Sequence, residues 1–403
     1  MNKIAGIVAE YNPFHNGHAY QVEQVRQQGA QAIVAVMSGH FLQRGEPALA
    51  DKWQRASWAV ASGVDLVIEL PLAIACRSAD YFAAGAVRLL NALGIVTHLA
   101  FGAEANSETL TPLSRLIPAP ATQAALRDGL KQGLSYPAAL EEAIKKGAPH
   151  LAPALRQPNN ILALSYLTAL RLYAPSLTPL IIPRRHSAYH DRTLTGPVAS
   201  ATAIRATLQN QGLAPQLQPV VPPATWQGLQ QCWDKQELRL DPAVLSNLLY
   251  YKLRLDKLDG RLPDLGEGLE NRLEKAINRT TNWNELLDAL KSKRYPRTRL
   301  ARQLTHYLLA TPADLPGRID REGPPYARVL AFNDTGRRLL HTCRAQASLP
   351  LITRVAPHLS GDRDSLLAAC LRQDVKATEC YDLLGPGAPT GARDLLTSPC
   401  YLT

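Results

Sequence analysis

Residues 4–20 read IAGIVAEYNPFHNGHAY, an apolar run that leads through a turn into the start of a helix. Asn12 and Pro13 break the strand, and Gly17 lacks a Cβ where a phosphate would come close to the backbone. The first turn of a helix presents unpaired N–H groups and the positive end of the helix dipole. This stretch therefore predicts a nucleotide-phosphate site directly after the first strand of an α/β sheet.

His15 and His18 lie three residues apart, so both imidazoles are expected on one face of the first helical turn. They can donate hydrogen bonds to an α-phosphate as charge builds up during attack on it. Most histidine pairs with this spacing are ordinary surface or core residues. This pair, however, follows the first buried strand, where an open α/β sheet binds its ligand. No Cys or third His lies close in sequence, so no metal site is predicted and both histidines are interpreted as catalytic.

Five apolar, β-rich runs alternate with helical patterns, which predicts βαβ units on a parallel sheet. The expected strands are 4–10, 32–38, 65–70, 98–102 and 180–183, and the expected helices are 18–28, 52–62, 79–93, 122–132 and 161–173. Residues 209–223 are rich in Gln and Pro and are interpreted as a linker, and residues 224–403 are expected to be mainly helical. The predicted fold is α/β: a Rossmann-like parallel-sheet domain over residues 1–208 followed by a mainly helical domain.

The chain has 403 residues and a formal net charge of +10, which indicates a polyanionic partner. Nucleic acid is the first candidate and an anionic membrane surface is the second. The sequence begins without a signal-peptide pattern and has no apolar run long enough to span a membrane. Its six cysteines are scattered without C-x-x-C spacing, as is typical of reduced thiols. A cytoplasmic protein without a membrane partner is therefore expected.

Residues 291–307, KSKRYPRTRLARQLTHY, hold six Lys or Arg side chains, two tyrosines and no acid. A solvated helix face is the usual explanation of a charge run, but such faces generally alternate in sign. Aromatic rings among cations suit stacking on unpaired bases beside phosphate contacts. A second basic cluster lies at 337–338, after 326–328. The predicted RNA-binding residues are Lys291, Lys293, Arg294, Arg297, Arg299 and Arg302.

Residues 199–205, ASATAIR, follow the last predicted strand and open a helix. Ser200 or Thr202 can simply cap that helix. Arg205 lies one turn further on, where it can reach polyphosphate oxygens presented to the same helix start. Together with the H-N-G-H segment, this indicates two helix starts that hold one triphosphate.

Polar side chains at other strand and helix ends are further candidates for nucleotide contacts. Arg184 and Arg185 end the fifth strand, where adjacent arginines suit an anion. Asn159 and Asn160 precede a clear helix, so they either cap it or read an adenine or ribose edge. Gly102 either lets the backbone pass close to a ligand or is a simple turn glycine.

Residues 38–47, SGHFLQRGEP, form a long polar loop after the second strand and are expected to contribute a pocket for a second substrate. An arginine fork there can hold both oxygens of a carboxylate, and a lysine on the next helix is the alternative partner. The predicted pocket residues are Gly39, His40, Gln43, Arg44 and Lys52.

The H-N-G-H segment and ASATAIR together resemble the nucleotidyltransferase α/β-phosphodiesterase superfamily. Within this superfamily, the sequence resembles one family more closely than the others. VAEYNPFHNGH, VMSGHFLQRGEPA, SGVDLVIELP, PNNIL and ASATAIR are similar to the bacterial tRNA(Met) cytidine acetate ligases, and KSKRY and PYARVL extend the likeness over the whole chain.

The resemblance implies ATP-dependent N4-acetylation of cytidine at the wobble position of elongator tRNA(Met), from acetate through an acetyl-adenylate. The pocket after the second strand would then hold acetate, residues 224–403 would bind tRNA, and Mg²⁺ would accompany ATP as a counter-ion. The nucleotide contacts it implies, with those argued above, are Ile7, Val8, Ala9, Glu10, Tyr11, Asn12, Pro13, Phe14, His15, Asn16, Gly17, His18, Ala19, Tyr20, Gly102, Asn159, Asn160, Arg184, Arg185, Ser200, Thr202 and Arg205.

Residues 184–191 depart from the family pattern, which often reads R-I-G-x-x-Y-H-D, so the roles of Arg185 and His186 stay open. One alternative function is a nucleotidyltransferase or acyl-adenylating ligase that acts on a small metabolite. Another is an RNA-binding protein that uses ATP only as a structural ligand. The basic second half argues against the first alternative, because a small substrate needs no such surface.

Overall fold

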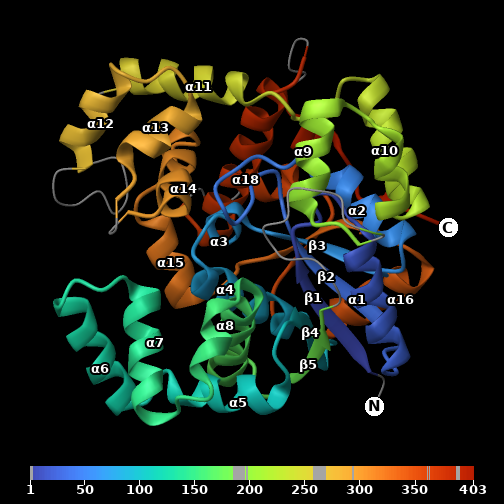
Figure 1. Ribbon diagram of the computed structural model, residues 1–403. Helices are drawn as coiled ribbons and strands as arrows, with labels where there is room; N and C mark the ends of the chain where they lie inside the picture. Colours follow the sequence, from blue (N-terminus) through green and yellow to red (C-terminus); the bar gives the residue numbers. More distant parts are fainter. Residues whose placement is uncertain are drawn as a thin grey trace.

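An eight-stranded sheet with the order β5-β4-β1-β2-β3-β6-β7, and with β8 beside β6, organises the chain (Figure 1). The computed structural model describes residues 3–184, 196, 198–256, 269–292, 295–360, 362, 364–386 and 391–403. The strands are β1 (Ile4–Ala9), β2 (Ala32–Ser38), β3 (Leu66–Leu70), β4 (His98–Ala103), β5 (Thr178–Pro183), β6 (Ala327–Phe332), β7 (Leu351–Ile352) and β8 (Cys400–Tyr401). The first five strands are mutually parallel, so their carboxyl ends share one edge.

The central strand β2 is buried on both faces. Ile33 and Met37 pack into the core on one face, and Val34 and Val36 pack into the core on the other. A parallel strand covered by helices on both sides reads as a continuous apolar run, which is why AIVAVM shows no polar alternation.

Helices cover both faces of the sheet (Figure 1). One face is packed by α1 (Asn16–Gln27), α2 (Lys52–Ala61), α9 (Ala201–Gln211), η2 (Pro215–Val220) and α10 (Pro223–Asp234). The other is packed by α3 (Leu72–Ala75), α4 (Ala79–Ala92), α5 (Ser107–Leu116), α6 (Pro120–Lys131), α7 (Tyr136–Gly147), η1 (Ala152–Arg156), α8 (Pro158–Tyr173), α15 (Leu315–Glu322), α16 (Asp334–Gln346) and α18 (Leu366–Leu383). Two short helices are α17 (Ala356–Leu359) and α19 (Arg393–Leu396).

A third core belongs to the second half of the chain. Its helices are α11 (Pro242–Leu255), α12 (Leu269–Ile277), α13 (Trp283–Leu290) and α14 (Arg297–Leu308). Phe41 from the loop after β2 and Leu72 from α3 are buried in the same cluster. The helical core is therefore packed directly against the loop at the ligand-binding edge of the sheet.

The α/β class and the five predicted parallel strands are confirmed, with strand ends within a few residues of the expected positions. The second half of the chain differs from expectation, because β6 lies antiparallel beside β3 and pairs Ala331 with Val67. The segment 209–223 also packs, since Leu217 and Val220 are buried in the core. The expected boundary at 209–223 therefore does not separate the sheet from residues 224–403. β7 and β8 are two residues long, too short for a sequence pattern, whereas the six-residue apolar run ARVLAF of β6 was overlooked among the helical patterns of the second half.

No helix within the described ranges is long and apolar enough to cross a lipid bilayer.

Candidate active site

A cavity of about 560 Å³ lies at the carboxyl ends of β1, β4 and β5. Glu10, Gly102 and Arg184 line it from these three strand ends, and the starts of α1 and α9 line it as well. The predicted nucleotide residues that line this cavity are Val8, Ala9, Glu10, Tyr11, Asn12, His15, Gly17, His18, Tyr20, Gly102, Asn159, Arg184, Ser200, Thr202 and Arg205.

His15 and His18 form the start of α1, and their rings stack with centroids 3.8 Å apart. His15 is the N-cap, and its Nδ1 accepts a hydrogen bond from the Gly17 N–H at 3.0 Å. His18 Nδ1 accepts a hydrogen bond from the His15 N–H at 3.2 Å. Because each Nδ1 is an acceptor, the proton of the neutral ring sits on Nε2. Each imidazole is thus a donor through Nε2.

Both histidines are kept neutral by their surroundings. Burial, together with the charges of Arg184 and Arg205, lowers the pKa of His15 to about 3. Burial also places the pKa of His18 well below its usual value, with His15 and Arg184 adding to the effect. Two neutral donors side by side suit a site where negative charge develops.

Gly17 is required by the histidine pair itself. A Cβ at this position would lie 2.8 Å from Cε1 of the His15 ring, closer than real Cβ atoms come to other groups. The sequence interpretation assigned this glycine to phosphate approach. The structure adds that it allows the His15 ring to fold back onto the helix start.

The start of α9 faces the same cavity. The Ser200 hydroxyl caps this helix by accepting a hydrogen bond from the Ala203 N–H at 3.1 Å. Arg205 Nη1 donates to the Asn12 carbonyl at 2.8 Å, which joins α9 to the turn before α1. Two helix N-termini and the guanidinium group of Arg205 therefore surround one space, an arrangement suited to a polyphosphate.

Some predicted nucleotide residues lie elsewhere. Ile7, Pro13, Phe14, Asn16 and Ala19 do not line the cavity. Ile7 and Phe14 are buried in the core, where they hold the strand and the turn in place. Asn16 donates from Nδ2 to the Pro219 carbonyl at 2.8 Å, on the other side of the helix start.

Asn160 is buried and its amide is used within the protein. Its Oδ1 accepts hydrogen bonds from the Glu104 and Ala105 N–H groups, both at 3.0 Å, and its Nδ2 donates to the Ala154 carbonyl at 3.0 Å. It holds the loop after β4, whereas Asn159 lines the cavity. Arg185 lies outside the described residues.

The loop after β2 borders the cavity through Gln43 and Arg44. The Gln43 N–H donates to Glu10 Oε1 at 2.8 Å, which fixes the loop against the end of β1. The cavity also has an aromatic wall that sequence reasoning missed, formed by Phe82, Phe101 and Tyr166. These residues come from α4, β4 and α8, and no local motif connects them.

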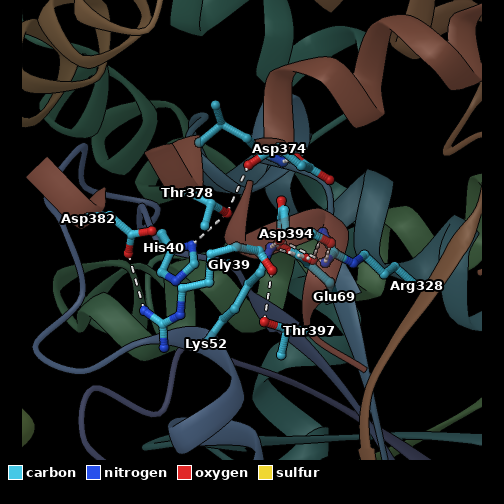
Figure 2. Close-up of polar contacts among 12 residues, drawn as sticks. Gly39, His40, Lys52, Glu69, Arg328, Asp374, Thr378, Asp382, Asp394 and Thr397 are labelled. Carbon is cyan, nitrogen blue, oxygen red and sulfur yellow. Dashed lines mark hydrogen bonds and ion pairs between the residues drawn. The ribbon is translucent and has the colours of Figure 1, made fainter. Parts of the chain in front are cut away.

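Lys52 does not reach the cavity, contrary to the prediction. Its Nζ lies 2.8 Å from Glu69 Oε1 and 2.8 Å from Asp394 Oδ1, and its side chain is fully buried. Arg328 completes the cluster through Asp394 at 2.7 Å and Glu69 at 3.2 Å (Figure 2). Lys52 is thus an internal ion-pair partner and not a ligand for a small carboxylate.

Gly39 and His40 lie beside the same buried cluster and also do not line the cavity (Figure 2). A Cβ on Gly39 would lie 2.4 Å from Glu69 Oε1. His40 Nδ1 lies 3.1 Å from the Thr378 hydroxyl. Of the five predicted pocket residues, Gln43 and Arg44 are the two at the cavity.

The basic segment covers the turn before α14 and most of that helix, with Lys291 exposed and Arg297, Arg299 and Arg302 half-buried. Arg297 donates to the Asp288 carboxylate, and the Arg299 guanidinium lies 5.0 Å from the ring centroid of Tyr295. Tyr295 and Tyr307 are buried, so their rings are not available to stack on RNA bases as predicted. Lys293 and Arg294 lie outside the described residues.

No group of three or more His, Cys, Asp or Glu side chains arranged to hold a metal ion occurs in the described part of the chain.

Comparison with known proteins extends these observations over the whole chain. A family model described as HIGH Nucleotidyl Transferase matches residues 1–393. A tRNA(Met) cytidine acetate ligase from Syntrophomonas wolfei is 41% identical over 98% of this chain and 99% of its own length. Another, from Alkaliphilus metalliredigens, is 37% identical over 99% of both chains.

Two crystal structures of Thermotoga maritima TmcAL are each 30% identical to this chain and cover 99% of both chains. The apo form I superposes with a TM-score of 0.93, and the form bound with alpha-thio ATP superposes with a TM-score of 0.91.

Proposed function

The chain belongs to the HIGH nucleotidyl transferase family, among the tRNA(Met) cytidine acetate ligases, and from that premise we propose a two-step reaction in the cavity. The protein is an ATP-dependent ligase that uses acetate. In the first step, an acetate oxygen attacks the α-phosphorus of ATP, and pyrophosphate leaves. In the second, N4 of the wobble cytidine of elongator tRNA(Met) attacks the acetyl carbon, and AMP leaves.

The observation that carries the first step is the pair of neutral, stacked imidazoles at the start of α1. Their Nε2–H groups donate to the α-phosphate oxygens, where negative charge increases in the transition state. Ser200, Thr202 and Arg205 at the start of α9 bind the β- and γ-phosphates that leave as pyrophosphate.

The adenine ring is proposed to lie against the aromatic wall, where Phe101 and Tyr166 have ring centroids 5.4 Å apart. Arg184 and Asn159 line the same cavity and can contact the ribose or phosphates. Mg²⁺ is proposed to enter with ATP as the counter-ion of its phosphates.

Acetate is proposed to bind near Arg44, which lines the cavity on the loop after β2. A guanidinium can hold both carboxylate oxygens, whereas Lys52 is fully engaged in the buried cluster. Activation as an adenylate is needed because free acetate is a poor acyl donor.

The tRNA is proposed to bind across the start of α14, where Lys291, Arg297, Arg299 and Arg302 supply positive charge. The family match over the whole chain and the packing of this helix against the cavity loop support that assignment. Because tRNA is the substrate, the cytoplasm is the proposed location.

Acetate-dependent exchange of labelled pyrophosphate into ATP tests the first step without tRNA. Wild type should exchange, and His15→Ala and His18→Ala should lose about 10²–10³-fold, as is typical when one donor to a developing charge is removed. Near-normal exchange by either folded variant would reject its role. Exchange that requires a different small acid would favour the small-metabolite ligase, and RNA binding without exchange would favour an RNA-binding protein.

A further inference from the structure

The transfer step needs a group that takes a proton from the cytidine N4, since the amine loses one as it becomes an amide. This inference rests on the proposed function. Among the described residues that line the cavity, the carboxylates are Glu10 and Glu46. We propose that the Glu10 carboxylate is the base that accepts the N4 proton.

Glu10 is held in position by contacts to both its main chain and its side chain. Its Oε1 accepts the Gln43 N–H at 2.8 Å, and its carbonyl accepts from Arg55 Nη1 at 2.5 Å. Glu10 is only partly buried, and it lines the cavity. A carboxylate with one oxygen fixed by a backbone donor keeps lone pairs on the other for a substrate N–H. The group is therefore both preorganised and reachable.

The other titratable groups at the cavity are poorly suited to this proton. His15 and His18 each use Nδ1 to accept a backbone N–H, so neither ring has an accepting nitrogen left for the substrate. Burial raises the pKa of both Tyr11 and Tyr166, so their hydroxyls stay protonated. Glu46 is exposed to solvent, where a carboxylate is a weak base.

Glu10 is joined through the loop after β2 to the helix where RNA is proposed to bind. The Gln43 N–H of this loop donates to Glu10 Oε1 at 2.8 Å, and the Thr305 hydroxyl on α14 donates to the Gly45 carbonyl of the same loop at 2.8 Å. A nucleobase that enters the cavity from α14 would therefore pass the loop that holds Glu10.

The electrostatic setting of Glu10 suits a base. Burial raises the pKa of Glu10, and the Gln43 N–H, Arg205, Arg44 and Arg55 oppose that rise. A carboxylate with a raised pKa is a stronger base once it has lost its proton.

In the proposed step, the N4 lone pair forms the C–N bond while the carbonyl electrons move to oxygen. The carbonyl then re-forms as the bond between the acetyl carbon and the phosphate oxygen breaks, and that electron pair leaves with AMP. The N4 proton passes to Glu10, which later releases it to solvent. Acetylcytidine, AMP and one proton are the products.

Single-turnover transfer tests this role. Enzyme is first loaded with acetyl-adenylate from ATP and labelled acetate, and tRNA is then added. Glu10→Gln should lose about 10²–10⁴-fold more in acetyl transfer than in adenylate formation, because the amide oxygen can still accept the Gln43 N–H but the amide cannot take up the N4 proton. The wild-type transfer rate should rise with pH as Glu10 loses its proton, and this rise should be absent in Glu10→Gln. Glu10→Asp, which keeps the carboxylate, should recover part of the rate.

Glu46→Gln tests the alternative that Glu46 accepts the N4 proton. Slow transfer by Glu46→Gln with normal transfer by Glu10→Gln would overturn the assignment. Equal losses of adenylate formation and transfer in Glu10→Gln would also overturn it, because they indicate a structural role. If wild type forms no acetyl-adenylate, the proposed function and this inference fail together. If the adenylate forms and Glu10→Gln transfers normally, only this inference fails.

Discussion

Thr305 on α14 donates a hydrogen bond of 2.8 Å to the carbonyl of Gly45. Gly45 belongs to the loop that brings Gln43 and Arg44 to the cavity. The basic helix and the active-site loop are thus in direct contact, although 260 residues separate the two partners. A tRNA held on α14 would therefore lie beside the loop that is proposed to bind acetate.

Gly45→Ala should disturb this contact. Gly45 has a φ of +77°, and a Cβ there would lie 2.4 Å from the Arg302 backbone nitrogen. We expect a lower melting temperature and a larger loss of tRNA acetylation than of acetate-dependent pyrophosphate exchange, because α14 must move off the loop. Gly133→Ala is the control, since Gly133 has a φ of +84° but open space around its Cβ position. Equal effects of the two substitutions on acetylation would show that backbone strain alone is responsible.

Removing cations at the end of α13 and in the first turn of α14 should weaken tRNA binding. Lys291→Ala and Arg299→Ala should each reduce the slope of log Kd against log salt by about 0.7–0.9 if each side chain contacts one phosphate. Pyrophosphate exchange should be unchanged, because phosphate contacts only position the RNA. Arg156→Ala in η1, an exposed arginine outside α13 and α14, serves as the control. An unchanged salt slope in the α14 variants would identify this segment as an ordinary solvated face.

The buried cluster around Lys52 should govern stability and not acetate binding. Among the described residues, Lys52→Met leaves Glu69 and Asp394 with Arg328 as their remaining cationic partner, and breaking a buried ion pair typically costs about 3–5 kcal/mol. Urea unfolding measures this loss, and the folded fraction should retain the wild-type Michaelis constant for acetate. Lys145→Met is the exposed counterpart, since Lys145 pairs with Glu142 at the surface, and it should leave the urea midpoint nearly unchanged. A raised Michaelis constant for acetate in Lys52→Met would contradict this prediction and indicate that Lys52 contributes to acetate binding.

Acidification should destabilise the protein through its buried histidines. Burial lowers the pKa of His306 to about 4, whereas an unfolded chain has a histidine pKa near 6.5. The unfolded state therefore binds more protons below pH 6.5, and stability is lost as the pH falls from 6.5 toward 4. His306→Gln should remove about 1–2 kcal/mol of the change in unfolding free energy between pH 7 and pH 5. Denaturant titrations at both values measure it, with the exposed His341→Gln as control; an identical pH dependence in His306→Gln and wild type would contradict the prediction.

Local sequence patterns were sufficient for the parallel sheet and for the histidine pair. The apolar runs at β1 to β5 result from burial on both faces of the sheet. Each run can therefore be recognised from the composition of its own strand. The H-N-G-H segment is similarly local, because His15, Gly17 and His18 interact within one helical turn. For the same reason, the ends of these elements lie within a few residues of the predicted ends.

Only the tertiary structure decided which polar side chains face the cavity. From the sequence, Lys52 and Arg44 are both candidate cations near an anion site. In the folded protein, β6 and α19 bring Arg328 and Asp394 beside Lys52, and Lys52 forms an ion pair with Asp394. Glu10 acquires its role from the loop after β2 and from α14, whose positions depend on packing between residues far apart in the chain. Periodicity and motifs report on neighbours within a few residues. Contacts between residues 260 and 342 positions apart depend on how the cores pack together, and no single segment of the sequence determines that packing.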